Sequence, residues 1–438
     1  VYGNHAAVCG PFGDNPPVLT NVELGQAERL CITALEEPDR HSALRFLRPA
    51  LEAIDSPMAG LRNEGLLTTH EIGVWLKERS DLAETGAKSQ QAITKRGKQL
   101  VMSLGFETLP LPGPASILVS QSKKLALAVF LDRNESPDGA SERFSNLSPV
   151  TYALTKADQE NLRYVIITNG PAIRIYPTDP GIGVGRRGRT ETFLELHLDL
   201  LREDRIPLLW YLFSADALDA DGSFEHLLDD SKRYAASLGE RLRERVYQNA
   251  IPQLAKALVE AQALKSPTQQ DLDSTYHMAL TILFRILFIA YGEDKDLLPY
   301  RTNDLYRARS FKQKAREMVR IREEGTKFDT NSFDHWDDAV RLFEAVNGGS
   351  RELGVPEYNG GLFSKDPQVS RTGAALSGLR LSNSVFGPVL TYILVDDSQE
   401  GIGPVDFRSL GVREFGTIYE GLLESELSIA ETDLIVDK

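Results

Sequence analysis

The sequence has little cysteine and no membrane-length hydrophobic run. Cys9 and Cys31 are its two cysteines, and the absence of metal-ligand spacing around them argues against a disulfide scaffold or a zinc domain. The longest apolar run, Leu280–Tyr291, is shorter than a membrane span and contains Arg285. Val1–Pro17 has neither the basic start nor the apolar core of a signal peptide. We therefore expect a cytoplasmic protein that does not bind a membrane.

The sequence also lacks an excess of positive charge. It has 49 Lys and Arg residues against 63 Asp and Glu residues, which gives a net charge of −14. A module that binds DNA by itself through a broad phosphate-binding surface is usually basic, so this balance argues against that class. A local basic patch could still contact DNA. The 438 residues, of which 42% are hydrophobic and 26% charged, are typical of a soluble globular protein with two or three domains.

Local patterns divide the chain into three segments. Residues 1–104 start irregularly through Thr20 and continue as helices, residues 105–215 mix strands and helices, and residues 216–438 are almost wholly helical. The expected fold class is therefore α+β and mostly helical. In the αβ segment we expect a helix and two strand pairs, namely Ser148–Glu160, Ser116–Ser120 with Leu125–Leu131, and Tyr164–Thr168 with Ala172–Tyr176, the last pair turned by Asn169-Gly170.

Four short motifs occur in a fixed order along the chain. They are LRNEGLLTTH (Leu61–His70), TILFRILFIAYGEDKDLLP (Thr281–Pro299), YNGGLF (Tyr358–Phe363) and LGVREFGTIYEGLLE (Leu410–Glu424). By periodicity alone the last motif is an ordinary buried helix. Together the four motifs resemble segments of large bacterial restriction–modification enzymes that fuse a nuclease to an adenine methyltransferase (type IIG/IIL-like). They also resemble the related methyltransferases of phage-defence systems.

The resemblance implies that the chain is the N-terminal portion of an N6-adenine DNA methyltransferase. Residues 105–215 would then be a PD-(D/E)XK nuclease-like domain, and residues 216–438 a helical connector. A methyltransferase domain that binds S-adenosylmethionine would follow Lys438, and this portion would hold no cofactor. The implied partners are double-stranded DNA and other proteins of a defence system.

Nuclease chemistry in that fold needs an Asp on one strand and Glu-x-Lys on the next. The carboxylates hold Mg²⁺, and the Lys positions or activates the attacking water. In this sequence Ala115 follows Pro114 where the Asp is expected. Val129 and Leu131 stand at the Glu and Lys positions, or Phe130 and Asp132 in the other register. Since neither register restores the triad, we expect a nuclease-like domain that has lost catalysis.

Three other sets of residues could replace the missing site. Gln121-Ser122-Lys123 has a permitted variant spacing but lies at an expected turn. Asp132 with Glu135 could bind a cation but has no suitably spaced Lys, and Glu293-Asp294-Lys295 belongs to the connector. An active endonuclease with a rearranged site therefore stays open as an alternative, and so does a non-enzymatic recruitment module.

Two groups of basic residues are candidates for DNA contact. The first is a glycine-spaced loop, and the second recurs at helical spacing and could follow a phosphate backbone. They consist of Arg186, Arg187 and Arg189, and of Arg309, Lys312, Arg316 and Arg320. The alternative for both groups is an ordinary solvated surface.

Overall fold

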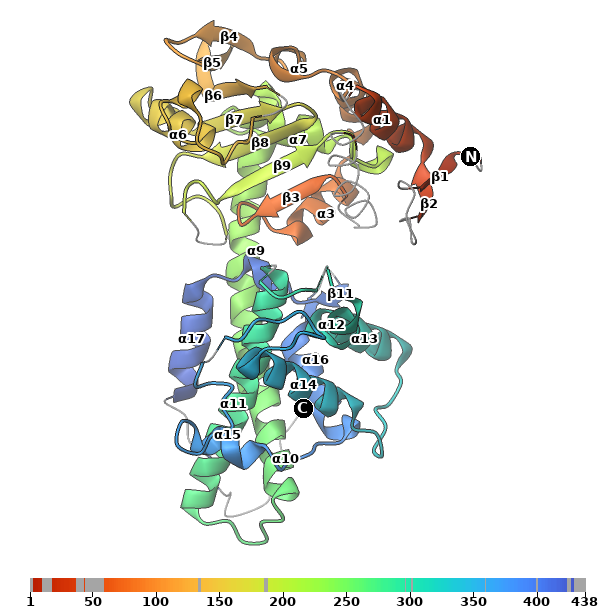
Figure 1. Ribbon diagram of the computed structural model, residues 1–438, viewed down its shortest axis with the longest axis vertical. Coiled ribbons are helices and arrows are strands. Elements are labelled where there is room, and N and C mark those ends of the chain that lie inside the picture. Colours follow the sequence, from red (N-terminus) through yellow and green to blue (C-terminus); the bar gives the residue numbers. More distant parts are fainter. Residues whose placement is uncertain are drawn as a thin grey trace. The chain divides into compact units, whose positions relative to one another are not determined.

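The computed structural model describes residues 3–9, 18–36, 43, 59–132, 135–184, 188–295, 297–300, 302–358, 360–398, 401–423 and 427–428. The chain divides into two compact units, unit 1 (Val1–Tyr234) and unit 2 (Ala235–Lys438), and each is described by itself. The protein is about 53% helical and contains a seven-stranded mixed sheet (Figure 1). The expected α+β, mostly helical fold class is confirmed.

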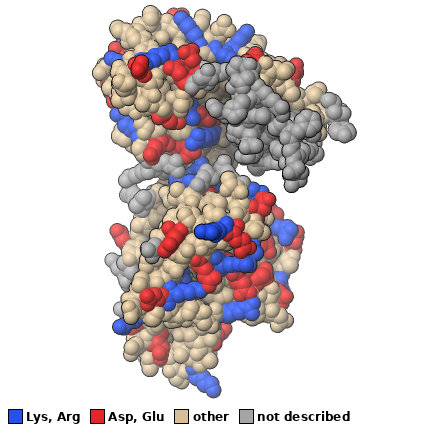
Figure 2. All heavy atoms as spheres, viewed as in Figure 1, with Lys and Arg blue, Asp and Glu red and all other residues tan. Residues whose placement is uncertain are grey.

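The surface carries charges of both signs. On the face drawn in Figure 2, Lys and Arg side chains lie among Asp and Glu side chains in each unit. Many of these charges are paired locally, as in Arg79–Asp81 at 2.8 Å and Lys88–Glu84 at 2.9 Å. Mixed charge of this kind favours solubility, and on the face shown it provides no extended positive surface for phosphates.

The sheet of unit 1 has one parallel pair among its described strands. The parallel pair is β6 and β7, because α6 (Pro149–Gln159) carries the chain back across the sheet between them. The Ser148 hydroxyl caps α6 by accepting the Thr151 N–H at 3.2 Å. The expected helix and both expected strand pairs are confirmed. The strand order is β3 (Leu61–Glu64), β9 (Phe193–His197), β8 (Ala172–Pro177), β7 (Tyr164–Asn169), β6 (Lys123–Leu131), β5 (Ala115–Ser120) and β4 (Glu107–Pro110).

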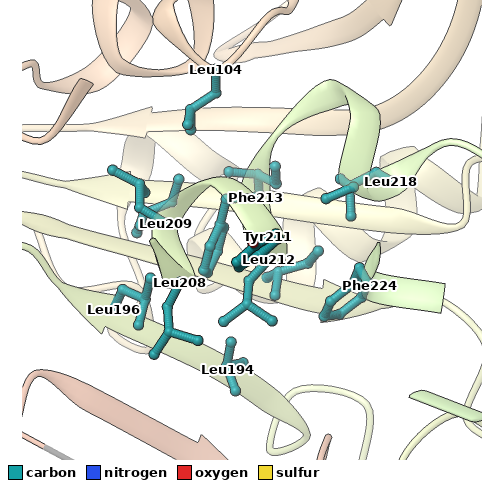
Figure 3. Close-up of a cluster of buried hydrophobic side chains, with 14 of the residues drawn as sticks. Leu104, Leu194, Leu196, Leu208, Leu209, Tyr211, Leu212, Phe213, Leu218 and Phe224 are labelled. Atoms are coloured by element: carbon teal, nitrogen blue, oxygen red, sulfur yellow. The ribbon is translucent and has the colours of Figure 1, made fainter. Parts of the chain in front are cut away.

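Helices cover both faces of this sheet. One face packs against five helices and the start of a sixth, and Figure 3 shows Leu208, Leu212 and Phe213 against Leu194 and Leu196 of β9. The opposite face packs against α6. Both faces are buried here, so the central strands are apolar on both sides. The helices of the first face are α3 (Thr69–Glu78), α4 (Leu82–Ala92), α5 (Gly97–Ser103), α7 (Leu208–Phe213), α8 (Ala215–Leu218) and α9 (Ser223–Arg245).

Residues 61–104 belong to the core of the sheet and do not form a separate segment. β3 is the edge strand, and Ile72 of α3 and Leu100 of α5 are buried in the same cluster as Ile166 of β7. The boundary between the compact units lies at residues 234 and 235, inside α9, and not at residue 104 or 215. The periodicity of the sequence shows which helix faces are apolar, but it does not show which other element covers each face. The boundary between the units depends on which elements pack together.

The N-terminus also differs from the expectation of irregular chain. β1 (His5–Cys9) and β2 (Val18–Glu23) pair antiparallel, and α1 (Leu24–Leu35) follows directly. The Gln26 side chain donates to the Leu200 carbonyl at 2.5 Å, and the Thr33 hydroxyl donates to Asp199 at 2.6 Å. These two bonds attach α1 to the segment that follows β9.

The described residues of unit 2 form helices and one short hairpin. Its longest helix, α11, starts at a capping box in which Thr268 and Asp271 bond each other's backbone N–H groups. Around it lie α10 (Ile251–Ala261), α12 (Asp304–Arg309), α13 (Phe311–Glu324), α14 (Asp334–Gly348), α15 (Arg371–Leu376), α16 (Asn383–Leu394) and α17 (Val412–Leu423), with the hairpin β10 (Val395–Ser398) and β11 (Gly401–Pro404).

Helix α11 (Gln269–Asp294) is the core helix of unit 2. Its length and composition would allow it to cross a membrane, but 72% of its most apolar window is buried inside the protein. It packs against α10, α13, α14 and α15. The apolar residues of α11 are therefore accounted for by this core, as in a soluble protein.

The carboxylate of Glu293, at the end of α11, is a junction between helices. It accepts hydrogen bonds from the Tyr306 hydroxyl at 2.9 Å and from the backbone N–H groups of Phe311 and Lys312 at 3.1 and 2.7 Å. The two N–H groups belong to the first turn of α13, where a negative charge is favourable. Burial nevertheless raises the pKa of Glu293 to about 7, since it opposes the ionised form more than these donors favour it.

Asp294 extends the junction to the segment after β11. It bonds the Lys312 ammonium at 2.6 Å and accepts the Phe407 N–H at 2.9 Å. The Lys295 ammonium donates to the Arg408 carbonyl at 2.9 Å. Burial raises the pKa of Asp294 as well, although Lys312 opposes the shift. The Glu-x-Lys residues at 293–295 therefore serve packing within unit 2.

Glu293 should make unit 2 less stable as pH rises towards neutrality. The pKa of Glu293 is about 7 in the folded protein and 4.5 in the unfolded chain. Its protonated side chain therefore contributes fully to stability below pH 4.5, and this contribution is lost as the pH rises through 7. The slope is about 1.4 kcal/mol per pH unit in that window. Glu293→Gln removes the titrating group. The difference in unfolding free energy between wild type and variant should therefore fall from pH 5 to 7 and be constant above pH 8.

Trp336 can report this change as the single tryptophan of unit 2, in a background with Trp75→Phe and Trp210→Phe. Urea denaturation followed by its fluorescence gives the two free energies at each pH. Tyr306→Phe removes one donor to the carboxylate and should move the fall to higher pH. A difference in unfolding free energy between wild type and Glu293→Gln that does not vary with pH would contradict the raised pKa of Glu293.

Candidate functional site

The register of the sheet aligns six residues in one row on the α6 face. Each member is the direct cross-strand partner of the next, from β5 at one end to β3 at the other. The first half of the row is apolar and the second half is charged. In order, the row consists of Ala115, Val129, Ile167, Arg174, Glu195 and Arg62.

The expected nuclease positions lie in the apolar half. Ala115 and Val129 are cross-strand partners, and Leu131 lies two residues further along the same face of β6. The three side chains are 3%, 0% and 8% exposed in the core beneath α6. The fold therefore brings these positions together, but they offer no group that could hold a metal ion or activate water.

The residues of the alternative register, Phe130 and Asp132, do not form a catalytic site either. Phe130 packs against the opposite core, and the Asp132 side chain is 88% exposed. Asp132 and Glu135 share Arg143, which compensates one of their two negative charges. Among the described residues, no group of three His, Cys, Asp or Glu side chains is arranged to hold a metal ion.

The variant motif at residues 121–123 forms the turn of the β5–β6 hairpin. Gln121 and Ser122 have φ angles of +48° and +67°, as the central residues of a tight hairpin turn require. The Lys123 ammonium bonds the Asp219 carboxylate at 2.9 Å. The turn conformation and this ion pair give the three residues a structural role.

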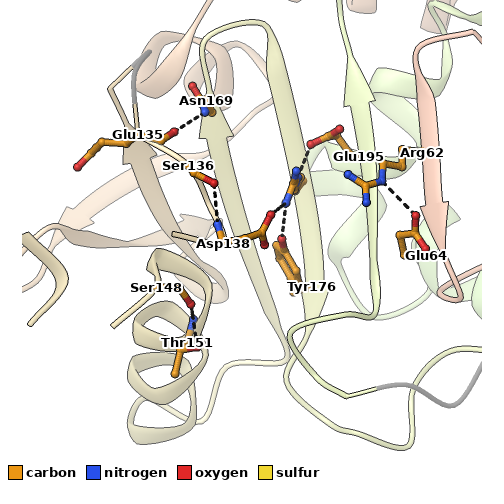
Figure 4. Close-up of polar contacts among 11 residues, drawn as sticks. Arg62, Glu64, Glu135, Ser136, Asp138, Ser148, Thr151, Asn169, Tyr176 and Glu195 are labelled. Atoms are coloured by element: carbon orange, nitrogen blue, oxygen red, sulfur yellow. Dashed lines mark hydrogen bonds and ion pairs between the residues drawn. The ribbon is translucent and has the colours of Figure 1, made fainter. Parts of the chain in front are cut away.

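The charged half of the row centres on the Arg174 guanidinium. It pairs with Glu195 of β9, and Nη1 donates to Asp138 Oδ2 and to the Tyr176 hydroxyl, both at 3.1 Å. Figure 4 shows Asp138, Tyr176 and Glu195 converging from three elements. Burial disfavours the charged guanidinium, but Glu195 and the hydrogen bonds outweigh it and raise the pKa of Arg174. Burial also raises the pKa of Tyr176 to about 12.

The loop after β6 covers the charged half. The Asn169 side chain donates to the Glu135 carbonyl at 2.6 Å, and Asp138 reaches Arg174 from the same loop (Figure 4). The Phe193 ring lies against Arg174, whose guanidinium carbon is 4.6 Å from the ring centroid. With two carboxylates and one phenol around it, Arg174 is fully compensated and has no positive charge to offer to a phosphate.

Sequence patterns did not predict this charged half. The sequence feature that points to it is an arginine in the strand AIRIY and a glutamate in the strand FLELH, each an isolated charge among apolar residues. Two opposite charges at matched positions of apolar strands indicate a buried pair. The match becomes visible only with the register between β8 and β9.

The basic loop is described only in part. Arg186 and Arg187 lie outside the described residues. Arg189 donates to both carboxylate oxygens of Asp158 on α6, at 2.8 and 2.9 Å. That bidentate pair attaches the end of the loop to α6, so Arg189 acts as a structural contact rather than as a free cation.

The predicted basic row of unit 2 is divided between two roles. Arg309 pairs with Asp338 at 3.6 Å, and Lys312 pairs with Asp294 at 2.6 Å. Arg316 and Arg320 are exposed on α13 and make no ion pair with another described residue. The structure thus divides the four cations between α12 and α13 and engages Arg309 and Lys312 in packing against α14 and α11, so that DNA contact by Arg316 and Arg320 stays a prediction.

No protein-family model, no curated protein and no solved structure matches this chain.

The Arg174–Glu195 pair should be a strong contributor to the stability of unit 1. Glu195→Gln leaves a buried guanidinium short of one carboxylate and should cost about 3 kcal/mol of unfolding free energy. Combining it with Arg174→Met should cost less than the sum of the single changes. Arg62→Ala is the control, since its side chain is 55% exposed, and it should cost less than about 1 kcal/mol.

Urea denaturation followed by fluorescence of Trp75 and Trp210, in a Trp336→Phe background, measures these energies in unit 1. Strictly additive costs for the two changes would show that Arg174 and Glu195 do not act as a pair.

Proposed function

We propose that this chain is the N-terminal, DNA-positioning part of a restriction–modification-like or phage-defence N6-adenine DNA methyltransferase. In this proposal residues 105–215 correspond to a PD-(D/E)XK nuclease-like domain without catalysis. Unit 2 is the connector to a methyltransferase domain that binds S-adenosylmethionine. The protein acts in the cytoplasm on double-stranded DNA, and its present residues carry no methyl transfer.

The observation that carries the proposal is the arrangement of β4, β5, β6, α6 and β7. Three antiparallel strands are followed by a helix and a strand parallel to the last of them, which fits the order of a PD-(D/E)XK nuclease. Ala115, Val129 and Leu131, which the proposal assigns to the catalytic positions, lie together on the α6 face of the sheet, and this supports the proposal. Their apolar side chains support a scaffold that has lost hydrolysis.

The exposed cations of α13 support a local contact with DNA. Arg316 and Arg320 are four residues apart on one helix, so both can meet successive phosphates of one strand. A contact of this size is compatible with the net charge of −14, which argues against a broad DNA-binding surface.

An exposed apolar cluster in unit 2 favours a second candidate, the recruitment of a defence-system protein. Phe288, Leu297 and Tyr358 are 41%, 60% and 38% exposed. The Phe288 and Tyr358 rings are 6.0 Å apart, and the Tyr358 hydroxyl donates to the Leu297 carbonyl at 2.8 Å. A partner recovered from a nuclease-treated lysate by wild type, but not by Leu297→Asp, would favour this candidate.

Charge reversal on α13 tests the DNA contact. Arg316→Glu with Arg320→Glu should weaken binding of a DNA duplex at least tenfold and lower the slope of log K against log salt by about two. Lys95→Glu with Lys98→Glu makes the same change in charge at exposed positions of unit 1. Equal weakening by both pairs would mean a nonspecific effect of charge, and unchanged binding by the α13 pair would exclude the contact.

A cleavage assay tests the loss of hydrolysis. Duplex DNA incubated with the chain and Mg²⁺ or Mn²⁺ should remain intact, because no described carboxylate group is arranged to hold the ion. Cleavage that is lost in Asp132→Ala would overturn the proposal in favour of an endonuclease with a rearranged site.

The mass and sequence of the native polypeptide test the methyltransferase assignment. The proposal expects residues beyond Lys438 with a glycine-rich cofactor turn and an Asn-Pro-Pro-aromatic loop, and adenine methylation that requires S-adenosylmethionine. A native polypeptide that ends at Lys438 would remove the methyltransferase assignment.

A further inference from the structure

Unit 2 contains a cavity of about 350 Å³ beside the middle of α11. Its lining includes the apolar side chains of Ile282, Val340 and Leu376 and the ring of Trp336. The Trp336 indole N–H is already bonded to the Leu379 carbonyl at 2.9 Å, so this part of the wall presents the ring rather than a donor. The volume is that of a site for a small organic molecule.

Arg285 lines the cavity and is 4% exposed. Its Nε donates to the Leu362 carbonyl at 2.8 Å and its Nη2 to the Ser364 carbonyl at 3.4 Å. The guanidinium carbon also lies 5.5 Å from the centre of the Phe343 ring. These groups orient the guanidinium, but carbonyls and rings carry no full negative charge.

Arg285 differs in this respect from Arg174, which has two carboxylates, and from Arg241 and Arg245, which share Asp396. Among the described residues, no carboxylate forms an ion pair with Arg285. Burial alone lowers its pKa to about 10, so it remains charged at neutral pH. A buried cation without a counterion is costly, and a bound anion would offset that cost.

The other charged groups of the wall do not supply the missing anion. Asp337 is held by Arg380, with Nε at 2.9 Å from Oδ1, and Glu344 is held by Lys365. Arg341 pairs with Glu352, which lies outside the lining, at 4.0 Å, so Arg285 is the lining cation that has no ion pair among the described residues. The lining therefore combines a buried cation with apolar side chains.

We propose that this cavity binds a small organic anion, whose carboxylate or phosphate pairs with Arg285 and whose apolar body lies against Ile282, Val340 and Leu376. The inference concerns unit 2 alone and does not depend on the nuclease-like interpretation of unit 1. The guanidinium fork suits either a carboxylate or a phosphate, so the two ligand chemistries are separated by experiment.

Isothermal titration calorimetry with four probes tests the site. Phenylacetate and phenyl phosphate each combine a ring with an anion, phenylacetamide keeps the ring without the charge, and inorganic phosphate keeps the charge without the ring. At least one of the two aromatic anions should bind at least tenfold more tightly than phenylacetamide and than inorganic phosphate. Comparing phenylacetate with phenyl phosphate identifies the preferred anion.

Two variants locate the binding. Arg285→Met removes the charge, and Val340→Phe fills the cavity from its partly exposed rim while Arg285 is kept. Each should weaken the preferred probe at least tenfold, whereas Arg351→Met, at an exposed position of unit 2 outside the cavity lining, should change it less than threefold. If Arg285→Met does not fold, as judged by circular dichroism, the affinity of Val340→Phe for the preferred probe is the deciding measurement.

Three results would overturn the proposal. One is no binding of either aromatic anion at millimolar concentration, and another is equal binding of phenylacetate, phenyl phosphate and phenylacetamide. The third is unchanged affinity in folded Arg285→Met or Val340→Phe. Inorganic phosphate binding as tightly as phenyl phosphate would overturn the assigned role of the apolar wall.

Discussion

A buried carboxylate at the end of α11 determines how the elements of unit 2 meet. Glu293 satisfies two backbone donors in the first turn of α13 and a hydroxyl at α12, and Asp294 bonds the N–H of Phe407. Helix N-termini leave donors without intrahelical partners, so an acidic side chain buried there fixes where the next helix begins. The Lys312 ammonium pairs with Asp294 as its counterion, so it is not available to another ligand. The pKa of Glu293, raised to about 7 by burial, follows from the same geometry.

Charge compensation separates the arginines of this protein by role. Arg174 is surrounded by Glu195, Asp138 and a phenol, and such a group stabilises a sheet but cannot attract a ligand. Arg316 is exposed and can exchange its hydration for a phosphate at little cost. Arg285 is buried with carbonyls and rings alone, and this is the combination that gains most from a bound anion. The spacing of arginines in the sequence does not distinguish these three environments.

The sequence predicted those parts of the fold that depend on local pattern. The β5–β6 and β7–β8 pairs and the helix between them follow from alternation, the Asn169-Gly170 turn and the Ser148 cap. The division at residue 104 failed because an apolar helix face can be covered by any surface, and here the same sheet covers α3 and α5. The charged half of the row could not be predicted because it requires the register of three strands at once. The ion pairs of Arg309 and Lys312 could not be predicted because their partners, Asp338 and Asp294, are distant in sequence.

The apolar half of the row has a physical explanation under the proposed function. In an active nuclease, carboxylates at positions 115 and 129 would be stabilised by a bound cation. Beneath α6 these positions are 3% and 0% exposed, and without a metal two ionised carboxylates there would face a large desolvation penalty with no partner. A scaffold that no longer binds the ion is therefore more stable with Ala115 and Val129. The charged half need not change with it, because Arg174 and its carboxylates compensate one another. A sheet that has lost hydrolysis can in this way keep its register and its core, and any contact with DNA then has to come from side chains outside the row.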